Sequence, residues 1–125
     1  FVEGALFSIG DVHASMGDGE VSMTGIEICA EVTVRVELIK GESISRPLIE
    51  TDDAWITTGD APKLVDAITI ACEEMAQFLQ HKLSIPFEKA YLLMSAIGDV
   101  RIGQVCDPDR FPATIRVVFP KINSA

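Results

Sequence analysis

The fold is set by residues 59–98, which run GDAPKLVDAITIACEEMAQFLQHKLSIPFEKAYLLMSAIG. Gly59, Asp60 and Pro62 predict a helix start, because Asp60 can cap free backbone N–H groups and proline fits the first turn. Apolar residues then recur every three or four positions, a spacing that buries one face of a long helix. They are Leu64, Ile68, Ala71, Cys72, Met75, Phe78, Leu79 and Leu83. We therefore expect a helix over about 61–83.

A second helix is predicted over about 86–97. The proline at its start interrupts the first helix, and Gly98 is a natural stop. Beyond it, residues 100–106 and 114–119 are rich in β-branched side chains. The residues between them, 107–112, have turn chemistry. These segments predict a C-terminal β-hairpin.

The residues before the first helix predict β-structure. Val32, Val34, Val36 and Leu38 alternate with polar residues, which is typical of a half-buried strand. Two shorter strand candidates, 48–50 and 55–57, are split by Asp52-Asp53, and the apolar segment 5–9 also resembles strand and turn. We expect an α+β fold: a β-rich N-terminal segment, two consecutive helices and the hairpin, in a single domain over residues 1–125.

Composition limits the class of protein. The chain of 125 residues is 48% apolar, which is typical of a globular domain. Its net charge of −9 argues against nucleic acid and anionic membranes as partners, because their phosphates would be repelled. No apolar run approaches the ~20 residues that span a bilayer. Cys29, Cys72 and Cys106 lie among apolar neighbours and predict buried free thiols in a reducing compartment.

The loop Gly10–Glu20 is the candidate for a catalytic or metal-binding site. Asp11, His13, Asp18 and Glu20 are interleaved there with glycines. A metal held by imidazole and carboxylates lowers the pKa of bound water and polarises a carbonyl, and a nearby carboxylate can transfer the proton. The residues leave alternatives open. A lone loop histidine is more often a surface or hydrogen-bonded group, and closely spaced carboxylates also suit calcium, although the EF-hand spacing is absent.

Residues 1–21, FVEGALFSIGDVHASMGDGEV, resemble the central signature of the acetamidase/formamidase family. Residues 90–107, AYLLMSAIGDVRIGQVCD, resemble its C-terminal signature, and RVVFPK at 116–121 resembles its last strand. Two positions depart from the pattern: Met16 replaces a frequent glutamine and Met23 a small residue. The abrupt start at Phe1 adds the expectation that the chain is the C-terminal portion of a longer amidase.

The resemblance implies roles for particular residues. We expect His13 and Asp11 to be metal ligands, Glu20 to be the general base, and Asp18 to be a ligand or an orienting group. Gln104 and Asp99 are expected to bind substrate, and Asp107 to line the pocket or brace the loop.

The resemblance also implies a function. It is hydrolysis of short-chain amides such as formamide or acetamide to carboxylate and ammonia, by water activated on a divalent metal. Zinc is expected first, with calcium as the alternative. The expected partners are the amide, the N-terminal part of the same enzyme and further copies in a homo-oligomer, in the cytoplasm. The alternative is a non-catalytic assembly or metal-binding module that is inactive without that N-terminal half.

Overall fold

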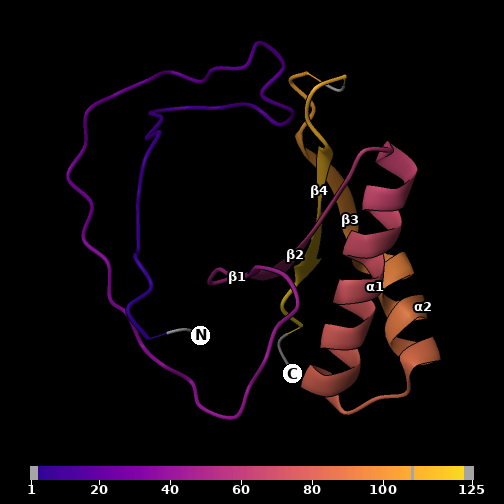
Figure 1. The fold of residues 1–125 in the computed structure, drawn as a ribbon. Coiled ribbons are helices and arrows are strands. Elements are labelled where there is room, and N and C mark those ends of the chain that lie inside the picture. The colour runs from indigo at the N-terminus through magenta and orange to yellow at the C-terminus, as the bar shows by residue number, and fades with distance from the viewer. Residues whose placement is uncertain (1–2, 108, 123–125) are drawn as a thin grey trace.

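The computed structural model describes residues 3–107 and 109–122. Its regular elements are β1 (Leu48–Glu50), β2 (Ala54–Ala61), α1 (Leu64–Leu83), α2 (Phe87–Ile97), β3 (Asp99–Gln104) and β4 (Ala113–Pro120). The strands form one antiparallel sheet in the order β1-β2-β4-β3, and both helices lie on the same side of it (Figure 1). The α+β prediction, with two consecutive helices and a C-terminal hairpin, is confirmed.

The core lies between the sheet and α1. Side chains along β4 alternate between buried and half-buried, as expected for a strand with one face against helices. The largest fully buried side chains come from β4 and α1: Phe119, Met75, Leu79, Ile115 and Val117. Trp55 of β2 stacks on Phe119, with ring centroids 6.5 Å apart. This core fixes the position of β3 and β4, on which part of the candidate site rests.

The predicted helix start is wrong by about one turn. Gly59, Asp60 and Ala61 belong to β2, where Asp60 pairs with Thr114 of β4, and α1 begins at Leu64. The N-cap residue of α1 is Lys63, whose side chain makes no capping hydrogen bond, and the Asp60 carboxylate pairs with the Arg46 guanidinium. Ladder hydrogen bonds to β4 therefore extend the strand through residues whose local chemistry favours a helix start.

The predicted strand over residues 32–38 is also absent from the described part of the chain. Val32, Val34, Val36 and Leu38 lie outside every strand and are exposed, as is the apolar segment that contains Leu6 and Phe7. Figure 1 shows the described residues from Glu3 to about residue 45 as a wide loop beside the sheet. A strand exists only where a neighbour pairs with its backbone, and no described segment lies there to do so.

The described cysteines are free, as predicted, but their predicted burial is wrong for Cys29, which is exposed. Cys72 and Cys106 are half-buried. No helix in the described ranges is long and apolar enough to cross a bilayer. Phe1, Val2 and Pro108, which belong to the predicted signature and turn, lie outside the described residues.

Candidate functional site: a looped-out hairpin and a pocket at its tip

Residues 12–28 fold back on themselves and place two distant side chains opposite each other. The Ala14 N–H donates to the Ile26 carbonyl at 2.8 Å, and the Ile28 N–H donates to the Val12 carbonyl at 3.1 Å. These bonds form an isolated antiparallel bridge between His13 and Glu27. Side chains of such opposed residues lie close together on one face. The Glu27 carboxylate, which lies outside the loop Gly10–Glu20, is therefore beside the His13 side chain.

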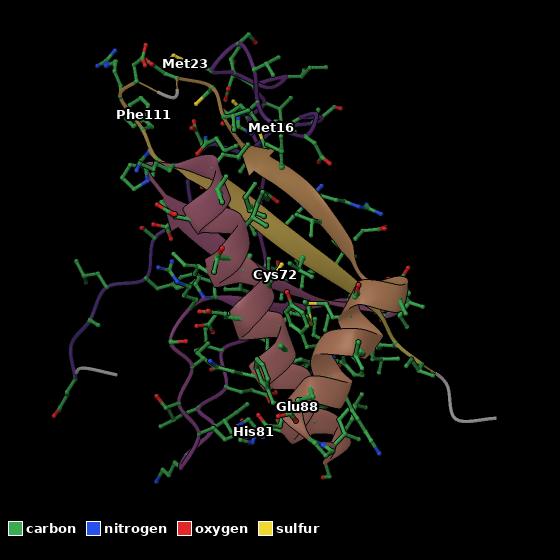
Figure 2. All side chains as sticks on the ribbon, turned by 90° about the vertical axis from the view of Figure 1, so that its right-hand side faces the viewer. Met16, Met23, Cys72, His81, Glu88 and Phe111 are labelled. Atoms are coloured by element: carbon green, nitrogen blue, oxygen red, sulfur yellow. The ribbon has the colours of Figure 1, made fainter. Side chains whose placement is uncertain are left out.

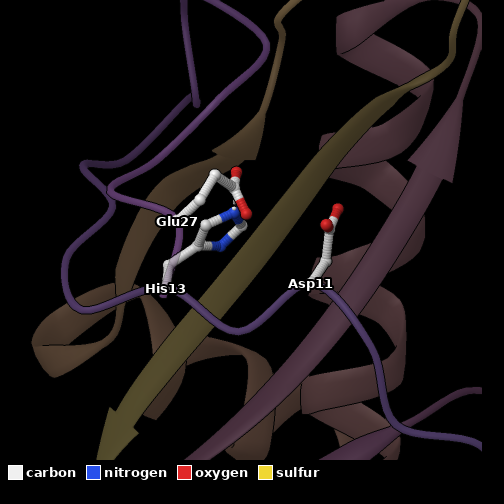
Figure 3. A group of neighbouring side chains, drawn as sticks. All are labelled: Asp11, His13 and Glu27. Atoms are coloured by element: carbon white, nitrogen blue, oxygen red, sulfur yellow. Dashed lines mark hydrogen bonds and ion pairs between the residues drawn. The ribbon is translucent and has the colours of Figure 1, made fainter. Parts of the chain in front are cut away.

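The side chains of His13, Glu27 and Asp11 lie near one another and could together hold a metal ion (Figure 3). One ligand atom from each lies within 4.8 Å of the other two. His13 Nε2 is 2.6 Å from Glu27 Oε1, and the Thr24 hydroxyl donates to that same oxygen at 3.1 Å. The His13 side chain is only 14% exposed, whereas that of Glu27 is 53% exposed.

This donor set suits a divalent cation. When Nε2 carries the proton and donates it to Glu27, Nδ1 keeps the lone pair that a metal accepts. A histidine held in this way by a carboxylate is the usual arrangement at protein-bound zinc, and the Asp11 carboxylate adds an oxygen donor. Asp11 also has a positive φ of 58°, uncommon for a residue other than glycine.

Glu27 was not predicted from the sequence. It is seven residues beyond Glu20, but Thr24, Ile26 and Glu27 match the end of the family signature that residues 1–21 resemble, and this match could have identified it. The pairing of residues 12–15 with 26–28 is the signal that identifies it. That pairing depends on the turn between them, which has no short hairpin motif.

The tip of the folded segment docks on the end of β3. Gly19 N–H donates to the Gly103 carbonyl at 3.2 Å, and Val105 N–H donates to the Gly19 carbonyl at 2.9 Å. The contact requires a glycine, because Gly19 has φ of +93°. Next to it, the Gln104 amide donates to the Glu20 carboxylate. The structure thus brings together two residues that the resemblance assigned to catalysis and to substrate binding.

A pocket of about 250 Å³ opens at this junction. It is lined by Glu20, Met23, Gln104, Cys106 and Phe111. Met23 and Phe111 lie at the same end of the molecule, whereas His81 lies at the opposite end (Figure 2). The lining combines a carboxylate and an amide with apolar and sulfur-containing side chains, and the volume is smaller than is usual for drug-sized ligands. Such a pocket suits a small molecule with one polar end.

The other predicted residues do not join this group. The Asp18 carboxylate pairs with the Arg116 guanidinium of β4. Asp99 is the first residue of β3, and its carboxylate accepts a hydrogen bond from Arg101 at 2.8 Å. It lies about 16 Å along the strand from Gln104. The Asp99 carboxylate raises the pKa of Arg101. Asp107 faces Arg110 at 3.8 Å. Glu20 and Asp18 both lie outside the Asp11–His13–Glu27 group.

The fold and site together define an α+β protein in which a long loop presents a histidine–carboxylate group beside a sheet. Residues 1–121 match the model of the acetamidase/formamidase family, and the chain belongs to that family. An acetamidase from Mycolicibacterium smegmatis is 52% identical over 42 residues, which are 33% of this chain and 10% of that protein.

Two solved structures are similar over most of the chain. A predicted acetamidase/formamidase from Thermoanaerobacter tengcongensis matches with a TM-score of 0.85 and 38% identity, over 96% of this chain and 39% of that one. An acetamidase from Bacillus halodurans matches with a TM-score of 0.76 and 33% identity, over 86% of this chain and 36% of that one. The chain therefore spans well under half the length of these relatives.

Proposed function

We propose that the protein hydrolyses short-chain carboxylic amides, such as formamide or acetamide, to a carboxylate and ammonia. The observation that carries the proposal is the group of Asp11, His13 and Glu27, in a chain that belongs to the acetamidase/formamidase family. Relatives named acetamidase support the substrate class. Hydrolysis of an amide needs an activated water and stabilisation of the oxyanion that forms at the carbonyl carbon.

Asp11 and His13 would hold a divalent metal, with zinc first and calcium as the alternative, and Glu27 would orient the His13 ring. A metal bound there would supply a water of lowered pKa and a Lewis acid for the carbonyl oxygen. A nitrogen donor favours zinc over calcium, which prefers oxygen ligands alone. The half-buried position of His13 limits competition from bulk water.

At the tip of the loop, the pocket lined by Glu20 and Gln104 would hold the amide. Glu20 would act at this pocket as a general base and then a general acid, taking a proton from water, directly or through one bridging water, and returning it to the departing ammonia. The Gln104 amide, which donates to that carboxylate, would keep it oriented. Asp18, paired with Arg116, would brace the loop against β4.

The test is release of ammonia from formamide and acetamide by the purified protein, before and after EDTA treatment. The chain contains one other histidine, His81, which is exposed on α1. We expect His13→Ala to abolish activity and metal binding, and the matched control His81→Ala to retain both. Activity that survives both EDTA and His13→Ala contradicts the metal mechanism.

A second candidate is an assembly or metal-binding module that is inactive without further polypeptide. The exposed apolar side chains of residues 26–39 favour it, because a cluster of exposed apolar residues is typical of an interaction site. The partner would be the part of the enzyme that corresponds to the remaining length of the solved relatives, within a homo-oligomer.

Size-exclusion chromatography with light scattering, followed by the ammonia assay on each species, separates the two candidates. A species that binds metal and releases no ammonia from any short amide favours the module.

The free cysteines are consistent with our proposal that the protein works in the cytoplasm, where thiols stay reduced.

A further inference from the structure

Arg116 lies on the face of the sheet that is turned away from the helices. It belongs to β4, the strand between β2 and β3, and its neighbours Ile115 and Val117 are fully buried in the core. Because side chains alternate along a strand, the Arg116 side chain projects from the opposite face. There its guanidinium donates to the carboxylate of Asp18, which comes from the N-terminal loop. A rigid central strand thus holds a side chain of the loop.

The charges around Arg116 favour this contact. The Arg116 side chain is 35% exposed, and its Nε atom is buried with no hydrogen-bond partner among the described residues. A charge that is partly removed from water needs an opposite charge beside it. Arg101 lies directly opposite Arg116 in the ladder and adds a like charge. Asp99, and after it Asp18, raise the pKa of the Arg101 guanidinium. Asp18 therefore offsets the repulsion between the two arginines.

A tight turn connects Asp18 to Glu20. The Glu20 N–H donates to the Gly17 carbonyl at 3.2 Å, so that the turn includes Asp18 and Gly19. The turn is attached to the sheet through two side chains: Asp18 bonds to β4, and Glu20 bonds to Gln104 at the end of β3. Without the bond of Asp18, the turn keeps only its contacts with the end of β3 and is free to pivot about them.

We propose that Arg116 is a positioning residue which, through Asp18, sets where the Glu20 carboxylate lies in the pocket at the end of β3. The inference rests on the role of Glu20 in the proposed function. A displacement of about 1 Å at a reacting group can lower a rate by about 100-fold, even when the change that causes it is remote. Arg116 acts through the loop and does not line the pocket.

The chain provides a matched control in a second arginine–aspartate pair. Arg46 bonds to Asp60, and their side chains are 30% and 54% exposed, close to the 35% and 52% of Arg116 and Asp18. Neither Arg46 nor Asp60 lines the pocket at the end of β3. Arg116→Gln and Arg46→Gln therefore remove the same charge from pairs of similar exposure, and only the first pair holds the tip of the loop.

Cys106 reports the position of the tip without any need for activity, because it lines the same pocket and is half-buried. The experiment is timed labelling with iodoacetamide, followed by mass spectrometry of peptides. Arg116→Gln is expected to label Cys106 about two- to fivefold faster, the range for loss of an exposed ion pair. Cys29 and Cys72 should keep their rates, and Arg46→Gln should match the unaltered protein. An unchanged Cys106 rate in Arg116→Gln overturns the proposal.

Exchange of the two charges tests whether the ion pair itself holds the tip. The double variant Asp18→Arg/Arg116→Asp is expected to label Cys106 at the rate of the unaltered protein. A double variant that labels as fast as Arg116→Gln contradicts the proposal. If Arg116→Gln does not fold, Asp18→Ala removes the same pair from the loop side and leaves β4 intact. It is expected to speed Cys106 labelling to the same extent, and an unchanged rate overturns the proposal.

Ammonia release from acetamide separates this inference from the proposed function. The kcat is expected to fall about 10–100-fold in Arg116→Gln, to recover in the double variant and to stay unchanged in Arg46→Gln. Faster Cys106 labelling with an unchanged kcat overturns the positioning role. An unaltered protein that releases no ammonia contradicts the proposed function, and the labelling rates then decide by themselves whether Arg116 holds the tip.

Discussion

The amide of Gln104 donates a hydrogen bond to the carboxylate of Glu20, across 84 residues of chain. The bond joins the tip of the N-terminal loop to the end of β3, and the backbone pairing of Gly19 with Gly103 and Val105 holds the two in register. Two separate stretches of sequence, both similar to family signatures, thus meet at one pocket.

Glu20→Gln is expected to lower kcat for acetamide by about 10²–10⁴-fold, because loss of a general base removes proton transfer in the transition state. Gln104→Ala, which leaves the carboxylate in place but unbraced, is expected to have a smaller effect. Ammonia release measures both, and Gln80→Ala on α1 is the control. Full activity in Glu20→Gln would assign the proton transfer to another group.

Glu27→Ala is expected to weaken Zn²⁺ binding about 10–100-fold, because the His13 ring loses the carboxylate that fixes its tautomer. Glu31→Ala, in the same loop and outside the Asp11–His13–Glu27 group, removes the same charge and serves as control. Chelator competition at fixed pH gives both affinities. Equal losses in the two variants would indicate a general effect of charge.

Met23 and Phe111 are expected to limit the length of the acyl chain, because they form the apolar wall of the Glu20–Gln104 pocket. Met23→Ala should raise kcat/KM for butyramide relative to formamide by about tenfold or more, since one methylene in an apolar pocket is worth about 10–200-fold in discrimination. Met16→Ala, a methionine outside the pocket lining, is the control. If Met23→Ala hydrolyses both amides with an unchanged ratio of kcat/KM for butyramide to that for formamide, Met23 does not contact the substrate.

Gly59→Ala is expected to destabilise the fold by about 1–3 kcal/mol or more, which is typical of overpacking. A Cβ at Gly59 would lie 2.4 Å from the Ala67 carbonyl oxygen and 2.6 Å from the Ala71 nitrogen, both in the backbone of α1. Urea unfolding measures the change. Gly10→Ala, with no heavy atom within 4 Å of its added Cβ, should shift the midpoint little; similar midpoints for the two variants would mean that α1 can move away from β2.

Cys29 is expected to react with iodoacetamide well before Cys72. Cys29 is exposed, whereas burial raises the pKa of the Cys72 thiol and so reduces the reactive thiolate at a given pH. Mass spectrometry of peptides after timed labelling at pH 8 gives the order. Faster labelling of Cys72 would indicate that α1 opens more readily than its packing suggests. As a control, unfolding in urea should remove the difference between the two labelling rates.

The helices illustrate what local sequence can predict. The spacing of Ala71, Met75 and Leu79 places them on one face of α1 whatever they pack against, and all three are fully buried. The start of α1 was misplaced because residues 59–61 are held by β4, whose strand is more than fifty residues further along the chain. The capping preferences of residues 59–62 depend only on neighbouring residues and cannot reveal that they pair with β4.

The loop illustrates the opposite case. Residues 32–38 have the alternation of a strand, yet no described strand pairs with them, and the alternation by itself does not specify a partner. For the candidate site, Asp11 and His13 could be identified from a short motif. Glu27 matches the end of that motif, but only the fold shows that it lies opposite His13.

By itself, the sequence determined the mixed fold, the two helices, the C-terminal hairpin and the similarity to amidases, because periodicity, turn residues and signature motifs are all local properties. The tertiary structure decided where Gly59–Ala61 belong, that Glu27 faces His13, and that Glu20 meets Gln104 while Asp99 lies at the far end of β3. Each of these depends on backbone hydrogen bonds between residues distant in sequence, and such bonds are specified by the partner as much as by the residue itself.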